Sequence, residues 1–368
     1  MKKELGIFIL LVVTCLIATV CTIDYDPALT GVSDFFHRLP HAKFISPANI
    51  TNQINLIGIS GIFSLGLGFV IITGGIDLSV GSMFALIGIV LAMALREWEL
   101  PWSPGHYWPW PLAAMLVILI PMALGWGHGL LITRLKIQPF IVTLCGLLLY
   151  RSVARYIAHD STKGFGNAEG FENLQSLASG SIHLFSLPGK TLPGQPSVLQ
   201  PGQPVNLPMP FVLMLLIAVI MWFVLHRSIY GRYLFAVGRN EEAARFSGIN
   251  TRRVISSSYV ILGFLTGISG ILFAFYTNSI SGSTHGQSYE LYGIAAAVLG
   301  GCSLRGGEGS VLGIIIGTAL LQVLRNLVTL MGIPSELDFA VTGVVVLIGV
   351  LIDQIVRLRA QKKLTAAR

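Results

Sequence analysis

Charged residues are scarce in this sequence. Lysine, arginine, aspartate and glutamate make up 11% of its 368 residues, whereas about a quarter of an ordinary soluble domain is charged. Hydrophobic residues account for 53%, which is more apolar surface than a soluble core of this length can bury. The composition therefore excludes an ordinary soluble protein and indicates that the lipid bilayer is the solvent for most of the chain.

The sequence also lacks the motifs of catalysis. It contains no G-x-x-x-x-G-K-[ST] phosphate loop, no G-x-S-x-G elbow and no H-E-x-x-H helix, and its eight histidines are scattered. The glycine-rich stretch at 300–309 lacks the lysine that a phosphate loop needs. We therefore expect that the chain is not an enzyme, hydrolyses no ATP by itself and uses no cofactor.

Cysteine is rare, and basic residues do not form runs. The four cysteines lie within or at the edge of apolar blocks, without a CxxC pair or a His/Cys cluster, so we expect neither a disulfide nor a metal site. The formal charge of +7 comes from lysines and arginines in short connections, never five or six together. This pattern excludes a basic arm for nucleic acid.

The apolar residues form about ten blocks, each near the roughly 20 residues that a helix needs to cross a bilayer. The blocks occupy residues 5–21, 54–73, 80–95, 112–133, 140–158, 211–225, 255–276, 291–302, 311–328 and 339–356. Block 291–302 is short for a crossing and is typical of a broken or re-entrant helix. We predict an all-α integral membrane protein, a polytopic bundle of about ten transmembrane helices in one domain over residues 1–368.

The first block has a second interpretation. Lys2 and Lys3 followed by a short apolar run resemble a secretory signal. The residues before Cys21 make a poor cleavage site, and nine further apolar blocks follow. Retention as a membrane helix is the favoured interpretation.

Basic residues predict the orientation. With a cytoplasmic N-terminus, sixteen of the 24 lysines and arginines fall on the cytoplasmic side, as the positive-inside rule requires. They are Lys2, Lys3, Arg134, Lys136, Arg227, Arg232, Arg239, Arg245, Arg252, Arg253, Arg305, Arg357, Arg359, Lys362, Lys363 and Arg368. We therefore expect both termini in the cytoplasm, external loops over residues 23–50, 96–111 and 159–210, and a cytoplasmic loop over 226–253.

Two of the external loops have distinctive compositions. The loop at 96–111 contains Trp98, Trp102, Trp108 and Trp110, which suit the aromatic belt at the level of lipid headgroups. The loop at 159–210 carries seven prolines from Pro188 onward, so it cannot hold a long helix.

The cytoplasmic loop contains a short predicted helix over 240–249. Asn240 can cap it, two glutamates suit its positive N-terminal end, and Gly248 can terminate it. Phe246 and Ile249, three residues apart, present an apolar edge to the cytoplasm, as a docking element would. An ordinary capped loop helix is the alternative. The residues predicted to contact a partner here are Asn240, Glu241, Glu242, Ala243, Ala244, Arg245, Phe246, Gly248 and Ile249.

Glu242-Ala243-Ala244, followed three residues later by Gly248, resembles the EAA-x-x-x-G signature of permeases of bacterial ABC importers. Three further stretches are similar to the ribose/xylose/arabinose/galactose-type branch of that family: 72–82 (ITGGIDLSVGS), 138–144 (QPFIVTL) and 296–304 (AAVLGGCSL). The leucine-proline pair that often follows the signature is absent, as is usual in this branch. The resemblance extends over residues 47–353.

The resemblance implies a permease subunit in a bacterial inner membrane that moves a monosaccharide or related small sugar. Its implied partners are ABC ATPase subunits docked on the 240–249 helix, a periplasmic or extracellular sugar-binding protein, a second permease subunit and membrane lipid. The transported sugar and the choice between a homodimer and a heterodimer stay open. An ion-coupled secondary transporter or channel is the alternative, disfavoured because only Asp77 lies near a span without a terminal explanation.

Glycine motifs supply the remaining candidates. Gly74 and Gly75 interrupt an apolar stretch where Asp77 and Ser79 can cap the next helix, and 300–310 repeats the pattern. Asp77 is interpreted either as this cap or as a polar group on the substrate path. The second set, spaced for close helix packing within one subunit or between two, is Gly309, Gly313 and Gly317.

Overall fold

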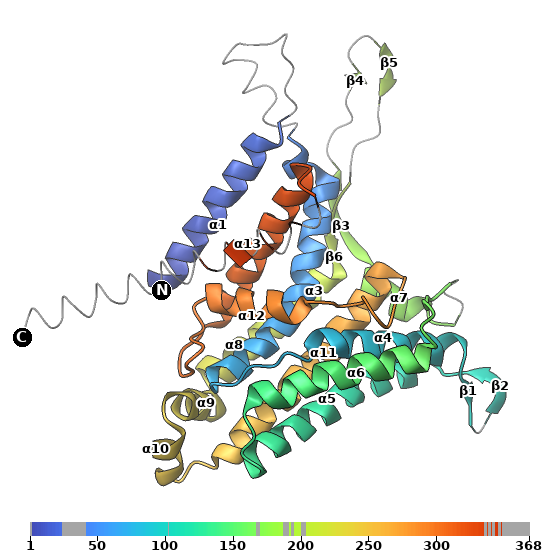
Figure 1. The fold of residues 1–368 in the computed structure, drawn as a ribbon. Coiled ribbons are helices and arrows are strands. Elements are labelled where there is room, and N and C mark those ends of the chain that lie inside the picture. The colour runs from blue at the N-terminus through green and yellow to red at the C-terminus, as the bar shows by residue number, and fades with distance from the viewer. Residues whose placement is uncertain are drawn as a thin grey trace, which may run out of the picture.

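The computed structural model describes residues 2–23, 42–101, 103–166, 170–186, 191–192, 195–199 and 204–334, with single positions up to 347. Over these ranges the chain is mainly helical, and its few strands lie outside the bundle (Figure 1). The predicted block at 339–356 falls outside the continuously described part of the chain. The prediction of an all-α polytopic membrane protein is confirmed.

Nine of the predicted apolar blocks are helices in the described ranges. Seven are long and apolar enough to cross a membrane: α1 (Lys2–Cys21), α3 (Pro47–Ile72), α5 (Trp110–Arg134), α6 (Pro139–Ala158), α8 (Met209–His226), α11 (Thr251–Thr277) and α13 (Val311–Leu330). Two are shorter, α4 (Val80–Arg96) and α12 (Tyr289–Leu299). The 11-residue α12 agrees with the prediction that this block is too short for an ordinary crossing.

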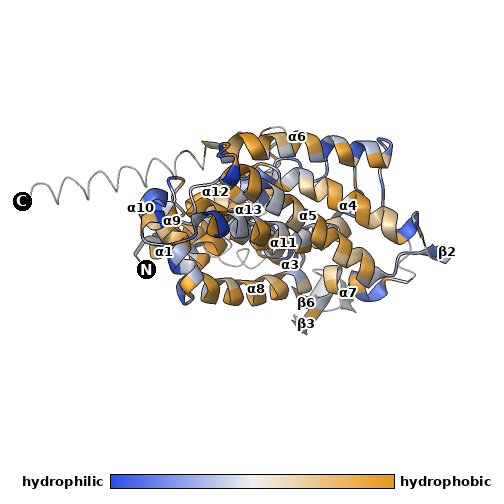
Figure 2. Cartoon of the chain, turned by 90° about the horizontal axis from the view of Figure 1, so that it is seen from below, coloured by the Kyte–Doolittle hydropathy of each residue, from blue (hydrophilic) through white to orange (hydrophobic). Residues whose placement is uncertain are grey.

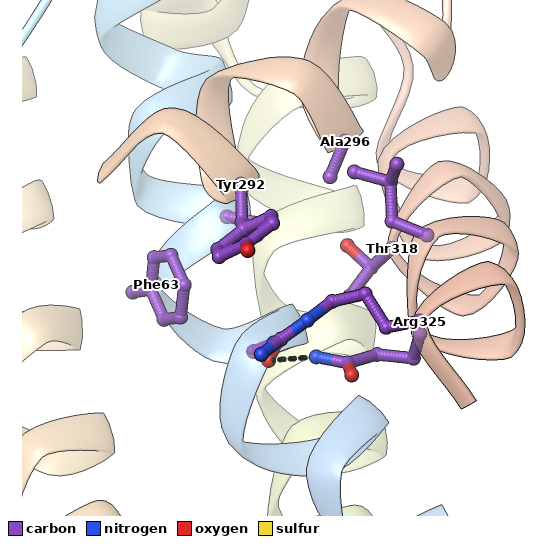
Figure 3. A pocket seen from close by; sticks show the side chains of 9 residues that line it. Phe63, Tyr292, Ala296, Thr318 and Arg325 are labelled. Atoms are coloured by element: carbon purple, nitrogen blue, oxygen red, sulfur yellow. Dashed lines mark hydrogen bonds between the residues drawn. The ribbon is translucent and has the colours of Figure 1, made fainter. Parts of the chain in front are cut away.

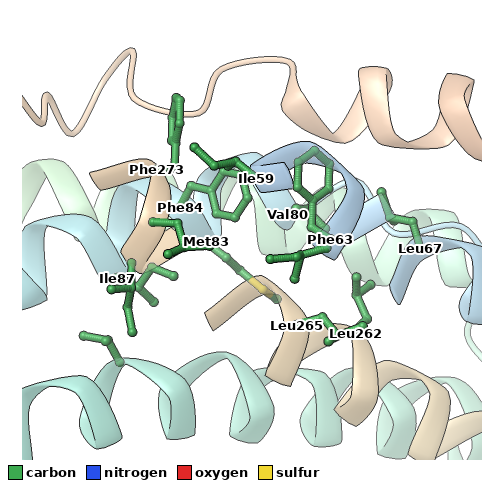
Figure 4. Close-up of a cluster of buried hydrophobic side chains, with 14 of the residues drawn as sticks. Ile59, Phe63, Leu67, Val80, Met83, Phe84, Ile87, Leu262, Leu265 and Phe273 are labelled. Carbon is green, nitrogen blue, oxygen red and sulfur yellow. The ribbon is translucent and has the colours of Figure 1, made fainter. Parts of the chain in front are cut away.

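The centre of the bundle is built by α3, α4 and α11, which are buried along most of their length. Apolar side chains fill the space between these helices, among them the rings of Phe63, Phe84 and Phe273 (Figure 4). Phe63 and Phe84 meet edge to face with ring centroids 5.3 Å apart, and Phe273 lies 4.6 Å from Tyr289. The outer helices instead expose apolar side chains, and α8 is coloured hydrophobic along nearly its whole length (Figure 2). Lipid is the expected neighbour of such a surface.

The strands and the short helix α7 (Glu172–Ser179) gather at one end of the bundle (Figure 1). Strands β1 (Glu99–Leu100) and β2 (Ser103–Tyr107) form a hairpin. In the proline-rich segment, β3 (Ser181–Ser186) pairs with β6 (Pro204–Pro208), and β4 (Thr191–Leu192) pairs with β5 (Gln195–Leu199). The described part of this segment contains no long helix, as its prolines predict.

The opposite end carries two helices that project from the bundle (Figure 1). They are α9 (Ile229–Arg239) and α10 (Glu241–Phe246), and the single residue Asn240 separates them. The sequence predicted α10 but not α9, which begins where the Ser228 hydroxyl accepts a hydrogen bond from the Gly231 N–H. A 3-10 turn, η2 (Lys43–Ile45), precedes α3.

Candidate functional site

The short helix α10 is held at both ends by its own sequence. Asn240 Oδ1 accepts a hydrogen bond of 2.9 Å from the Ala243 N–H, and two glutamates occupy the first turn. Thr251 at the start of α11 donates a hydrogen bond of 3.1 Å to Glu241 Oε1. The cap satisfies one N-terminal N–H group of the helix, and the two glutamates match the helix dipole.

Gly248 terminates α10 in a Schellman motif. Its backbone has φ of +84°, which a residue with a Cβ resists. The Gly248 N–H donates to the Arg245 carbonyl at 3.0 Å, and the Ile249 N–H donates to the Ala244 carbonyl at 3.1 Å. The predicted cap and terminator are confirmed, and the helix ends at Phe246 rather than Ile249.

Phe246 is the exposed apolar feature of α10. Its side chain is 83% exposed, and the Arg245 guanidinium lies 5.6 Å from its ring centroid. The prediction that Phe246 and Ile249 form one exposed apolar edge is wrong for Ile249. The left-handed turn at Gly248 reverses the chain and packs Ile249 against the core. Ala244 is buried and holds the helix to the protein. Phe246 is therefore the large apolar side chain that α10 leaves exposed.

Three segments meet at the C-terminal end of α9, the helix that precedes α10. They are the C-terminal end of α3, the C-terminal end of α9 and the turn at 303–307. The Gly307 N–H donates a hydrogen bond of 2.8 Å to the Ile72 carbonyl. A Cβ on Gly238 would lie 1.8 Å from that carbonyl oxygen, and a Cβ on Gly306 would lie 2.6 Å from the Gly238 carbonyl oxygen. We call Gly238, Gly306 and Gly307, with Ile72, the glycine junction.

Asp77 lies in the loop that leads from this junction to α4. Its side chain is 1% exposed, and its Oδ1 accepts hydrogen bonds from the Ser79 N–H at 2.7 Å and the Ser79 hydroxyl at 2.6 Å. Ser79 occupies the N-cap position but its side chain makes no capping bond to α4. The carboxylate therefore organises the start of α4 from two residues upstream.

A buried chain of side chains ties Asp77 to two other helices. His128 Nδ1 on α5 lies 3.4 Å from Asp77 Oδ2, and His128 Nε2 lies 2.7 Å from the Tyr150 hydroxyl on α6. A neutral imidazole carries one N–H, so a proton on Nδ1 facing the carboxylate leaves Nε2 to accept the Tyr150 O–H. The Thr143 hydroxyl also donates to the Ile76 carbonyl at 3.3 Å. The loop before α4 is thereby fastened to both α5 and α6.

Sequence analysis did not identify His128 or Tyr150. The available signal was a histidine in the middle of an apolar block, since polar groups at membrane depth are costly and need partners. The prediction that Asp77 is the only charged residue near a span that a helix end does not explain is also wrong. Arg151 lies within α6, Arg325 within α13, and Glu290 is buried in the first turn of α12.

The packing glycines bring α13 against α12 of the same chain. A Cβ on Gly313 would lie 1.9 Å from the Gly300 carbonyl oxygen, and one on Gly317 would lie 2.2 Å from the Ala296 carbonyl oxygen. Gly309 differs from the prediction because it precedes the helix. The Ser310 hydroxyl accepts from the Gly313 N–H, so α13 begins at Val311, and Gly309 contacts the Ile72 side chain instead. These contacts support packing within one subunit.

Replacing Asp77 separates its two interpretations. Asp77→Asn keeps an oxygen for the two Ser79 hydrogen bonds and turns an amide N–H toward His128, which the other imidazole tautomer can accept. Thermal stability of the purified protein should therefore fall by about 1 kcal/mol or less, and the transport that the resemblance implies should survive. Asp77→Ala leaves the buried Ser79 N–H and hydroxyl without an acceptor and should cost about 2–3 kcal/mol. Loss of uptake in Asp77→Asn with normal stability would instead place the carboxylate on the substrate path.

The apolar bundle defines a multi-pass membrane protein, and comparison with known proteins identifies the class. Residues 49–350 match the family described as Branched-chain amino acid transport system / permease component. The chain therefore belongs to this family of transport permeases.

Individual relatives match along nearly the whole chain. The sequence is 34% identical over 313 residues to the ribose import permease protein RbsC of Bacillus subtilis (strain 168), covering 85% of this chain and 86% of that protein. Identity to RbsC of Escherichia coli (strain K12) is 33% over 311 residues, with coverage of 84% and 87%. The xylose transport system permease protein XylH of Escherichia coli (strain K12) is 29% identical over 368 residues, with coverage of 90% and 91%.

Proposed function

We propose that this chain is the membrane-spanning subunit of an ATP-driven importer for a monosaccharide. The observation that carries the proposal is the similarity to ribose import permeases over 84–85% of the chain. The family description names branched-chain amino acids, but the relatives named for ribose and xylose favour a sugar. The capped helix α10 with its exposed Phe246 supplies a surface for a separate ATPase subunit.

In this mechanism, ATP-driven movement enters the bundle through the glycine junction. Docking on α10 displaces the end of α9, where Gly238 touches both the end of α3 and the 303–307 turn. One of these segments leads to Asp77 and α4, and the other joins α12 to α13. A rigid backbone contact without intervening side chains transmits small displacements with little loss. A second permease subunit and an external sugar-binding protein complete the proposed assembly.

Reconstitution tests the function directly. Liposomes holding the chain, its ATPase and its binding protein should accumulate radiolabelled ribose or xylose only when ATP is present, and should not accumulate leucine. Accumulation of leucine would support the amino-acid specificity that the family description suggests. Sugar uptake driven by an ion gradient without the ATPase would establish a secondary transporter and refute the proposal.

The proposed orientation places both termini and α10 in the cytoplasm. In a cysteine-free background, Ser247→Cys beside α10 should react with an impermeant maleimide only after the cytoplasmic face is opened. Ser176→Cys on α7 should react in intact cells, because both side chains are exposed and lie at opposite ends of the bundle. The reversed labelling pattern would invert the topology.

A further inference from the structure

A small cavity lies among α3, α12 and α13, near the middle of the two long helices (Figure 3). Its volume is about 10 Å³, which is room for about one water molecule. The polar side chains that line it are Ser60, Ser64, Tyr292, Thr318, Gln322 and Arg325. Neither aspartate nor glutamate is among the lining residues.

The cavity is the inner end of a polar seam between α3 and α13. Nearest the strand-bearing end of the bundle, Asn49 and Asn326 exchange hydrogen bonds of 3.0 and 2.8 Å through their amides. Further inward, Gln322 Nε2 donates to the Ser60 hydroxyl at 2.7 Å (Figure 3). Residues four apart on a helix share a face, so α13 contributes an aligned row of polar side chains to this seam.

Hydrogen bonds between α3 and α13 explain the Asn49–Asn326 and Ser60–Gln322 pairs but not the cavity. Polar side chains that join membrane helices do so in partnered sets. Ser64 is 1% exposed, and its hydroxyl has no hydrogen-bond partner in the described part of the chain. A buried hydroxyl without a partner costs about 1–3 kcal/mol. Its position at the cavity wall makes this hydroxyl available to a ligand.

We propose that this cavity is the closed form of a subsite that binds the hydroxyl groups of the transported sugar. The proposal rests on the sugar-import function proposed above. Serine, threonine and glutamine side chains both donate and accept, as sugar hydroxyls do. The Phe63 ring beside them offers an apolar surface for the C–H face of a sugar ring. The one charged side chain in the lining, Arg325, stacks its guanidinium over the Tyr292 ring at 4.3 Å from the centroid, so the hydroxyl and amide groups are the main polar contacts open to a ligand.

The wall formed by α12 is built to move. Residues with positive φ flank this short helix, Gly286 and Ser288 before it and Gly301 after it. Such positions are common hinge points, because they mark where the chain turns sharply between elements. The segment that follows α12 reaches Gly306 and Gly307 in the glycine junction. Movement received by α10 therefore has a short route, through the contacts of the glycine junction, to the wall that closes the cavity.

Cysteine labelling tests whether the cavity opens. Ser64→Cys is introduced into the cysteine-free chain, reconstituted with ATPase and ribose-loaded binding protein, and exposed to a small methanethiosulfonate reagent. The introduced thiol should stay unreacted at rest and react during ATP-driven turnover. The matched control is Thr266→Cys on α11, because the Thr266 hydroxyl is equally buried and equally unpartnered but does not line the cavity.

Removing the hydroxyl tests whether it binds substrate. Ser64→Ala deletes no hydrogen bond within the protein, so thermal stability should not fall. Maximal ribose uptake should drop about three- to tenfold, the value of one neutral hydrogen bond, whereas Thr266→Val should leave uptake within about twofold.

Three outcomes are distinguishable. Turnover-dependent labelling of the Ser64→Cys variant together with slower uptake by Ser64→Ala supports the subsite. Normal uptake by Ser64→Ala, with the Ser64→Cys thiol unreactive throughout turnover, overturns the subsite and leaves the importer function standing. Failure of the unmodified chain to import any sugar overturns the proposed function and the subsite with it.

Discussion

Replacing Phe246 with aspartate is expected to abolish ATP-driven uptake and to release the ATPase subunit from the purified complex. The ring is 83% exposed and contributes little to the fold of this chain, so the variant should insert and purify normally. A buried aromatic anchor in an interface commonly contributes about 2 kcal/mol or more. Its loss should therefore weaken docking by about 30-fold or more, and a buried carboxylate should add a further penalty.

The measurement is the amount of ATPase that copurifies with each variant, together with the rate of ribose uptake. Phe246→Leu is the matched control, because it keeps an apolar side chain at the same position and should retain most of the ATPase. Stoichiometric ATPase on Phe246→Asp would show that α10 is an ordinary loop helix. The candidate coupling residues would then have no assigned partner.

The features that sequence analysis predicted correctly are those determined within a few consecutive residues. The cap at Asn240 and the terminator at Gly248 act through backbone groups of the same short helix. Apolar blocks of membrane-spanning length likewise carry their own signal. Block 291–302 was predicted to be irregular from its length alone, and α12 has 11 residues.

The features that the sequence did not reveal depend on contacts between distant segments. Ile249 follows Phe246 at helical spacing, but the turn at Gly248 packs its half-buried side chain against the core. The Asp77–His128 and His128–Tyr150 contacts join three segments of the bundle, and no local periodicity connects them. Single charged residues such as Arg151 did not stand out in the sequence, because one charge changes the mean hydropathy of an apolar block only a little.

The glycine junction provides the second prediction with a large effect. Gly238→Ala should reduce uptake at least tenfold while the ATPase remains bound. The new Cβ would lie 1.8 Å from the Ile72 carbonyl oxygen and 2.5 Å from the Gly307 nitrogen. These two atoms are hydrogen-bonded to each other at 2.8 Å, so the methyl group must force the end of α9 away from both segments. Alanine favours a helix by about 1 kcal/mol over glycine, but an overlap of this size with backbone outweighs that gain.

Binding-protein-stimulated ATP hydrolysis and sugar uptake should be measured together with ATPase copurification. Gly238→Ala leaves the capping residues of α10 unchanged, so the ATPase should still bind. Stimulated ATP hydrolysis and sugar uptake should be lost. Phe246→Asp should instead lose the bound ATPase. Gly127→Ala on α5 is the matched control, because a Cβ there meets no atom within 4 Å. Uptake near the wild-type rate in Gly238→Ala would show that movement reaches the bundle by another route, because the added methyl group disrupts the contacts of the glycine junction.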